Sequence, residues 1–280
     1  MNVARKEAQR YMTALESMYM RHMQGGDDVR SGVVCYRTRT VRSGDMLECI
    51  TYPVYKQQQH RRSVRAQKTG AAMQEVNRRN AVRRMERLVQ CNFGRDAIIL
   101  TCTYEGQKPE QDAAEHQLDL YLGRLRRAAR RGGRELKYVA VTECASTGRV
   151  HHHLIVEGVS RDEAENKWHS GFCNARRYQQ RTEQFIGIVR YMLKYRSTQD
   201  ALVSRRIRVS HGMLQPVETV SDHRVSLRKM EQICRDMQDG GAEVLRRVYP
   251  GYDLHERPEI RRSDFMPGAY MYARLWRVTV

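Results

Sequence analysis

The chain has 280 residues, with 50 Lys and Arg against 32 Asp and Glu, which gives a formal net charge of +18. An excess of this size predicts a polyanionic partner. Hydrophobic residues make up 40% of the chain and occur in short runs, which excludes the fibrous and membrane-spanning classes and indicates a soluble globular protein. We expect a core of roughly 120–150 residues with flanking segments rather than one large domain.

The start of the chain and its cysteines indicate a reducing compartment. Residues 1–10 carry three basic side chains and no apolar segment follows them, so we expect no secretory signal and a cytoplasmic location. The seven cysteines are scattered and form no C-x-x-C pair, which predicts packed thiols rather than a zinc or redox site.

The first ninety residues predict a helix, a hairpin and a second helix. Residues 1–24 place apolar side chains at near-helical spacing, typical of an amphipathic helix. Residues 33–41 and 46–55 alternate in polarity and flank Arg42-Ser43-Gly44-Asp45, which predicts a β-hairpin. Residues 62–90 predict a basic helix, whose arginines either face solvent or contact phosphate groups.

From residue 92 onwards the pattern becomes regular. The predicted elements in chain order are a strand at 97–104, a helix at 111–131, strands at 137–143 and 150–156, a helix at 161–168, a strand near 172–178 and a helix from Thr182 to Tyr195. This order predicts an α+β fold, an antiparallel sheet with helices packed on one face, of the ferredoxin-like kind. Beyond residue 196 the chain is less regular, and we expect an irregular C-terminal part.

Three consecutive histidines lie on a predicted strand. Strand alternation puts His151 and His153 on one face and His152 on the apolar side, where it reads as a packed or hydrogen-bonded core residue. Glu143 ends the preceding strand, and a hairpin through 144–149 brings it beside the histidines. Two imidazoles and a carboxylate form a mixed site suited to Mg²⁺, Mn²⁺ or a harder transition metal. The alternative is that the pair is structural, because histidine also serves as a half-buried polar residue.

The last predicted helix of this region carries two tyrosines. Tyr191 and Tyr195 are separated by four residues and lie off the apolar stripe, and Lys194 can reach the same ligand as Tyr191. A tyrosyl hydroxyl is a weak nucleophile at its ordinary pKa near 10, but an ammonium group and a metal-held phosphodiester make it competent for phosphoryl transfer. Tyrosines on a helix also serve for packing or stacking.

Taken together, these motifs resemble those of the HUH endonucleases. They are Thr101-Cys102-Thr103-Tyr104, Glu143, Gly148-Arg149-Val150-His151-His152-His153, Trp168-x-x-Gly171 and Tyr191-x-x-Lys194. Their order and spacing are most similar to those of rolling-circle replication-associated proteins of small bacterial phages, plasmids and integrated elements. The resemblance implies an HUH nuclease core, ferredoxin-like or RRM-like, at 92–212, between an N-terminal part at 1–91 and an irregular or helical extension at 213–280.

The resemblance also implies roles for individual residues. His151 and His153 correspond to the metal-binding histidines and Glu143 to the third ligand. His152 stands where the family usually has a bulky hydrophobic residue. Tyr191 corresponds to the nucleophile, with Lys194 as the lysine of its motif.

Tyr195 corresponds to a second nucleophile, as in two-tyrosine members of the family. The position that would be its lysine is Thr198, so we rank it below Tyr191.

The activity implied by this resemblance is initiation of rolling-circle replication. The metal polarises a phosphate of single-stranded origin DNA, and the tyrosine attacks it, leaving a 5′-phosphotyrosine and a 3′-hydroxyl that primes a host DNA polymerase. Rejoining reverses the step. The sequence has no G-x-x-x-x-G-K-[ST] loop, so a host helicase is the expected partner for unwinding in the bacterial cytoplasm.

Basic residues are the candidates for contacts to the DNA backbone. The two arginine-rich helices precede or surround the predicted histidine sheet, so we expect a single DNA strand to be led across that sheet. The candidate residues are Arg149, Arg126, Arg127, Arg83 and Arg84.

Two other classes of function compete with this interpretation. A non-catalytic nucleic-acid-binding protein, with structural histidines and stacking tyrosines, accounts for the charge but not for Glu143. A histidine phosphoesterase needs two H-x-S/T pairs, and the chain has one H-x-H run and no second motif.

Overall fold

The computed structural model describes residues 32–55, 71–106, 109–144, 149–178, 185–194, 207–236, 238–239, 241–262 and 267–278. The chain divides into two compact units, one formed by Met1–Arg84 with Pro216–Val280 and the other by Met85–Gln215. The helix expected at 1–24 lies outside the described residues. No helix within the described ranges is both long and apolar enough to cross a membrane.

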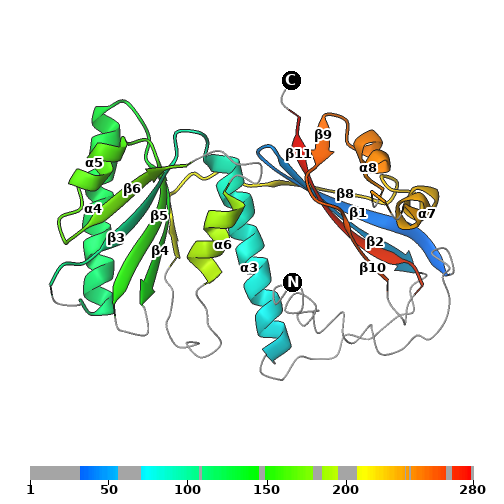
Figure 1. Ribbon diagram of the computed structural model, residues 1–280, viewed down its shortest axis with the longest axis horizontal. Coiled ribbons are helices and arrows are strands. Elements are labelled where there is room, and N and C mark those ends of the chain that lie inside the picture. The colour runs from blue at the N-terminus through cyan, green and yellow to red at the C-terminus, as the bar shows by residue number, and fades with distance from the viewer. Residues whose placement is uncertain are drawn as a thin grey trace. The chain divides into compact units, whose positions relative to one another are not determined.

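The second unit is the α+β fold that the sequence predicts (Figure 1). Its elements are β3 (Ile98–Thr103), α4 (Gln111–Arg131), β4 (Lys137–Cys144), β5 (Val150–Glu157), α5 (Arg161–Asn166), β6 (Cys173–Arg177), α6 (Ile186–Lys194) and β7 (Ile207–Val209). The sheet is antiparallel throughout, in the order β6-β3-β5-β4-β7. The β-α-β-β-α-β order is that of ferredoxin-like folds, so this prediction is confirmed.

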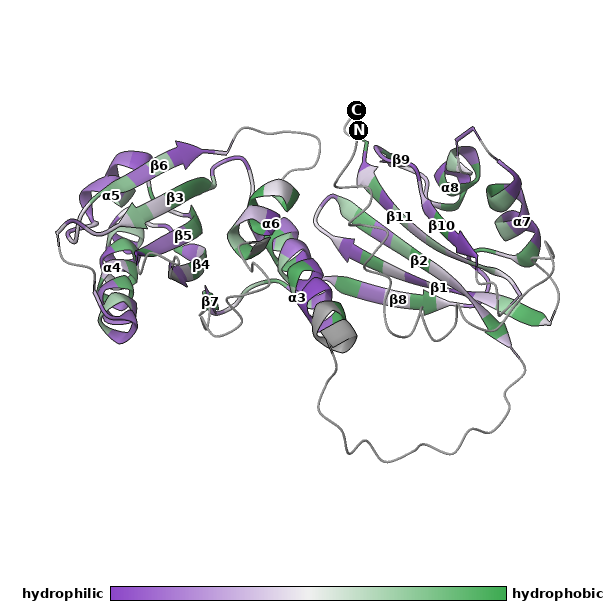
Figure 2. Ribbon diagram, turned by 60° about the horizontal axis from the view of Figure 1, so that its bottom comes forward, coloured by the Kyte–Doolittle hydropathy of each residue, from purple (hydrophilic) through white to green (hydrophobic). Residues whose placement is uncertain are grey.

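Two helices cover one face of this sheet. α4 is amphipathic, with green hydrophobic and purple hydrophilic residues interleaved along it in Figure 2. Its apolar side packs on strand residues such as Leu100, Ala140 and Leu154, all fully buried. α5 begins with a capping box in which the side chains of Ser160 and Glu163 satisfy each other's backbone N–H groups. The opposite face of the sheet is therefore left for other elements.

α6 lies on that opposite side (Figure 1). The apolar stripe expected from the sequence is buried, and Tyr191 off the stripe is 49% exposed, as the helical period predicts. Arg190 of α6 donates to the buried carboxylate of Glu86, which lies on the last part of α3 (Ala71–Asn92). These contacts fix how α6 sits over the sheet.

The first unit combines segments from both ends of the chain. Its elements besides the first part of α3 are β1 (Val33–Ser43), β2 (Met46–Tyr55), β8 (Val217–Ser221), α7 (Leu227–Arg235), α8 (Ala242–Val248), β9 (Tyr252–Leu254), β10 (Glu259–Arg262) and β11 (Ala269–Arg277). The sheet has the order β10-β11-β2-β1-β8, and β9 pairs with β11. The β1–β2 hairpin expected around Gly44 is confirmed, with Ser43 paired to Met46.

The expectation of an irregular C-terminal part is wrong for much of this segment. β11 lies between β10 and β2 in the sheet, and α7 and α8 contribute Met230, Ile233 and Leu245 to a core shared with the hairpin. Tyr36 is buried and its hydroxyl accepts from the Ala269 amide, which joins β1 to the start of β11. The sequence-based boundaries at 91/92 and 212/213 thus separate segments that share one sheet.

Candidate functional site

The strand register brings the predicted metal ligands to one end of one face of the second sheet. Glu143 on β4 and Thr103 on β3 are both paired with His151 on β5, so the three side chains share a face. His153 follows on the same face, two residues along β5, opposite Thr101 and Val141. The alternation expected from the sequence is therefore the one that the structure has.

The side chains of Glu143 and His153 are in contact. Glu143 Oε2 lies 3.4 Å from His153 Nε2, and both side chains are almost buried. Thr101 Oγ1 lies 3.4 Å from His153 Nδ1 and fixes the ring from the other side. With Nε2 as a metal ligand, the Nδ1–H group would donate to Thr101, the orienting bond that ligating histidines use. The His151 ring is stacked parallel to that of His153, 6.5 Å away between centroids.

Tyr191 completes this group from α6. Its ring meets the His153 ring edge to face, with centroids 5.7 Å apart. Half of the tyrosine remains exposed, so its hydroxyl is accessible to a ligand. Lys194 is the last residue of α6, but its side chain is outside the described part of the structure, as are Tyr195 and Thr198.

The donor set of this group fits a hard or borderline divalent cation. Two imidazoles and one carboxylate from His151, His153 and Glu143 are the mixed nitrogen and oxygen ligands that suit Mg²⁺ or Mn²⁺ sites with open positions. Within the described ranges, no three His, Cys, Asp or Glu side chains are gathered closely enough to hold an ion as they stand. Binding would need rotation of side chains that already share one face.

His152 has a different role, as the sequence predicts. It is fully buried on the helix side of the sheet, where its Nε2 lies 2.7 Å from Tyr104 Oη and its Nδ1 3.0 Å from Thr142 Oγ1. Since the Tyr104 hydroxyl donates to the Ala114 carbonyl, the Nε2–H of His152 donates to Tyr104 and the Thr142 hydroxyl donates to Nδ1. Burial lowers the pKa of His152 to about 3, so the ring is neutral. A satisfied neutral histidine thus replaces the bulky hydrophobic residue usual in the family.

The sequence analysis missed Phe172. This side chain is 68% exposed, and its carbonyl accepts from the Thr103 amide, beside the histidine end of β3. Because Cys173 packs into the helix-side core, Phe172 points to the histidine side. An exposed aromatic ring next to a phosphate site is typical of a base-stacking platform. Its position directly after Trp168-x-x-Gly171, before an alternating strand, is the signal that could have found it.

The Trp168-x-x-Gly171 motif holds this edge in place. Trp168 is buried, and its indole N–H donates to the Thr103 carbonyl. Gly171 has φ 149°, and a Cβ there would lie 2.5 Å from both the Thr103 oxygen and the Glu105 nitrogen. Glycine is therefore required for the close approach of these backbones.

The structure does not bring all predicted DNA-contacting arginines to this site. Arg149 is exposed directly before β5 and lies at the histidine end of the sheet. Arg126 and Arg127 are exposed on α4, which covers the opposite face. The expectation that they line a strand crossing the histidine face is wrong, because helical periodicity shows which side of a helix is buried but not which face of a sheet it covers.

Arg83 and Arg84 belong to the first unit. The Arg83 guanidinium lies 4.6 Å from the centre of the Tyr272 ring, a cation–π contact with β11. Arg84 is exposed, and its guanidinium donates to the Asn80 carbonyl one turn earlier.

Comparison with known proteins agrees with the motifs. Residues 97–200 match a family model for the replication-associated proteins of the ORF2 type, a segment that contains Glu143, both ligand histidines and Tyr191. The match covers less than half of the chain, and neither a curated protein nor a solved structure matches it. It supports a role in the initiation of rolling-circle replication. Over residues 97–200, the chain is thus similar to the replication-associated proteins of this family, as its motifs indicate.

Proposed function

We propose that the protein is a metal-dependent endonuclease and strand transferase that nicks single-stranded origin DNA through Tyr191. The observation that carries this proposal is the grouping of Glu143, His153 and Tyr191 on one face at one end of the second sheet. The match to replication-associated proteins supports the same substrate.

The chemistry divides between the metal ligands and the tyrosine. A divalent cation held by His151, His153 and Glu143 would act as a Lewis acid on the scissile phosphate. The Tyr191 hydroxyl forms a new O–P bond to this phosphate and loses its proton, while the bond from phosphorus to the 3′ oxygen breaks and that oxygen gains a proton. The products are a 5′-phosphotyrosine and a 3′-hydroxyl that primes a host polymerase. Attack by a 3′-hydroxyl on the phosphotyrosine reverses the step and rejoins the strand.

Other residues of the chain would position the substrate. The Phe172 ring offers a stacking surface for a base beside the phosphate, and Arg149 provides a cation at the same end of the sheet. Lys194 of the Tyr191-x-x-Lys194 motif would stabilise the charge that develops on the phosphate. Tyr195 is the second candidate nucleophile, for a subsequent transfer.

Transfer of a DNA label to the protein tests this proposal. The full chain is incubated with a random pool of single-stranded oligonucleotides labelled at the 3′ end, with Mn²⁺ or Mg²⁺, and separated on a denaturing protein gel. A 5′-phosphotyrosine keeps the labelled 3′ fragment on the protein, and sequencing of this fragment reads out the cleavage site. We expect Tyr191→Phe to abolish the labelled band and Tyr195→Phe to retain it.

Two results would overturn the proposal. Wild-type protein that acquires no label with either metal is not a strand transferase of this type. A band that persists in Tyr191→Phe but disappears in Tyr195→Phe moves the nucleophile to Tyr195.

A further inference from the structure

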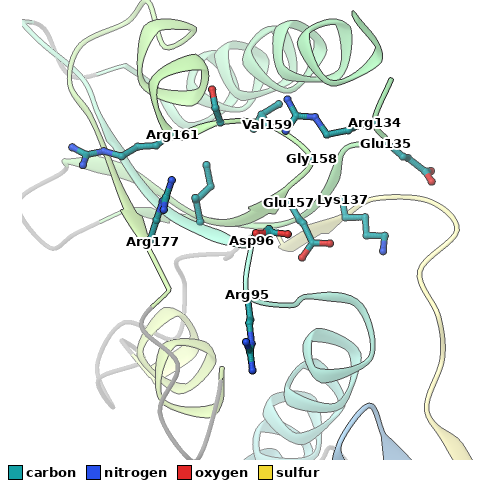
Figure 3. A pocket seen from close by; sticks show the side chains of 12 residues that line it. Arg95, Asp96, Arg134, Glu135, Lys137, Glu157, Gly158, Val159, Arg161 and Arg177 are labelled. Atoms are coloured by element: carbon teal, nitrogen blue, oxygen red, sulfur yellow. The ribbon is translucent and has the colours of Figure 1, made fainter. Parts of the chain in front are cut away.

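Two neighbouring pockets lie away from the histidine face of the second unit. The first, of about 620 Å³, is shown in Figure 3 and is lined by residues that include Arg134, Lys137 and Arg177. The second, of about 440 Å³, is lined by residues that include Arg126, Arg130 and again Arg134. Because the pockets share Arg134 and Glu135, they form one surface, which we call the distal arginine surface.

This surface is at the other end of the sheet from the candidate active site. Its lining includes Ile98, Lys137 and Glu157, which are the ends of β3, β4 and β5 farthest from the ligand histidines. Lys137 and Glu143 are six positions apart on β4, which corresponds to about 20 Å of extended strand. A DNA segment held here is therefore distinct from the nucleotides beside Tyr191.

The surface is positively charged. The two pockets are lined by seven Lys and Arg residues and three acidic residues. One of the three carboxylates, that of Glu157, accepts the Gly94 amide at 2.8 Å. Arg130 and Arg177 are exposed and form no ion pair with the described residues, so their charges are available to an anionic ligand. In Figure 3, Arg134 and Arg177 approach the pocket from opposite sides, with Asp96 and Glu157 between them and Lys137.

The shape of the lining separates two kinds of nucleic acid. Proteins that bind single strands combine cations with aromatic rings on which bases stack. The exposed large aromatic residues of the described second unit are Phe172 and Tyr191, both at the histidine end, whereas the one ring that lines the distal arginine surface, Tyr138, is 8% exposed. Cations without stacking rings are sufficient for a phosphate backbone whose bases are paired.

We infer that the distal arginine surface binds the phosphate backbone of double-stranded DNA that adjoins the single-stranded segment at Tyr191. This inference rests on the proposed function for the identity of the nucleic acid. It gives Arg126 a DNA contact on the helix side of the sheet instead of on the histidine face. It also divides the substrate, with the paired arm at one end of the domain and the nicked strand at the other.

Removal of two arginines, one from each pocket, tests the inference. The full-length double variant Arg130→Ala/Arg177→Ala is compared with wild type in binding three fluorescent probes: a duplex, a single strand of the same length, and a duplex with a single-stranded tail. We expect the affinity for the duplex and the tailed duplex to fall about tenfold and the slope of log affinity against log salt to decrease by about two, with no change for the single strand.

A matched control removes two arginines from α7 of the other unit. Arg228→Ala/Arg235→Ala lowers the net charge by the same amount, and we expect it to change duplex affinity less than twofold. Equal losses for the single strand and the duplex, or losses as large in the α7 control, would overturn the inference in favour of general charge attraction. Unchanged duplex binding in the Arg130→Ala/Arg177→Ala variant would also overturn it.

The label-transfer assay keeps this result separate from the proposed function. Wild-type protein that binds duplex through the distal arginine surface but acquires no labelled strand would disprove the nuclease proposal and leave the surface standing. Labelling that proceeds on single strands while the double variant binds duplex normally would do the reverse.

Discussion

Glu143 and His153 face each other across the β4–β5 strand pair, with Oε2 3.4 Å from Nε2. A carboxylate in contact with an imidazole on a shared sheet face is suited to hold one cation between them. We expect Glu143→Gln and His153→Ala each to weaken Mn²⁺ binding by at least about tenfold, as measured by titration of the protein without DNA using electron paramagnetic resonance.

The matched control for metal binding is the neighbouring histidine. His152→Leu changes an imidazole on the other face, so Mn²⁺ affinity is expected to stay within twofold of wild type. If His152→Leu weakened binding as much as His153→Ala, the assignment of faces to the metal site would be wrong.

Phe172 gives a second prediction, on single-stranded DNA. Its exposed ring is positioned for stacking, and a base–aromatic stack contributes about 1–3 kcal/mol. Phe172→Ala should therefore weaken binding of a short single strand by at least about fivefold in fluorescence anisotropy without metal, and Phe172→Trp should retain it. Leu120→Ala removes an exposed apolar side chain from α4 and serves as the control; a loss of the same size there would argue against stacking at Phe172.

His152 predicts a dependence of stability on pH. Its folded pKa of about 3 is below the unfolded value of 6.5, so the unfolded chain takes up a proton first as the pH falls. Its contribution to stability is complete above pH 6.5 and is lost at up to about 1.4 kcal/mol per pH unit between pH 6.5 and 3. Relative to wild type, His152→Leu should therefore gain about 2 kcal/mol in free energy of unfolding between pH 7.5 and 5.

Urea unfolding followed by tryptophan fluorescence measures this difference. Trp168 packs against His152 in the second unit and Trp276 lies in the first, so a Trp276→Phe background reports the unit of interest. A stability difference that is the same at both pH values would show that His152 is not held neutral by burial.

A buried ion pair links α4 to the edge strand β7. Arg208 Nη2 lies 2.6 Å from Glu115 Oε2, and the carboxylate is 4% exposed. Arg208→Ala would leave this carboxylate buried without its cation, and we expect a loss of about 3–5 kcal/mol in free energy of unfolding. The double variant Arg208→Met/Glu115→Leu should recover most of this loss, which urea unfolding of both proteins can check. If the double variant were no more stable than the single one, loss of packing rather than an unpaired charge would be the cause.

The sequence predicts the fold of the second unit well because its information is local. The alternation of 150–156 identifies the ligand face, and the apolar period of 111–131 gives α4 with the bounds that the structure has. The face of the sheet that α4 covers is a matter of chain connection, which periodicity does not contain. Arg126 and Arg127 were assigned to the wrong side for this reason.

The first unit was not predicted as one sheet because its pairings are remote. β11 resembles any short alternating strand, and nothing in its residues names β2 as its neighbour. The Gly and Pro residues around 265–272 were taken as signs of irregular structure, whereas they lead into a strand in which Ala269 bonds to the Tyr36 side chain. Phe172 was overlooked because burial of Cys173, which sets its direction, is a tertiary property.

The insertion of one unit into the other has a consequence for synthesis of the chain. Residues 85–215 are continuous, so the second unit can fold as soon as they leave the ribosome. The first unit then still lacks β11, and closing so long a loop makes its sheet slow to complete. Until that strand arrives, β2 presents an unpaired edge of apolar and aromatic residues, the kind of edge on which newly made chains aggregate. The last strand to be made is therefore also the one that protects the first hairpin.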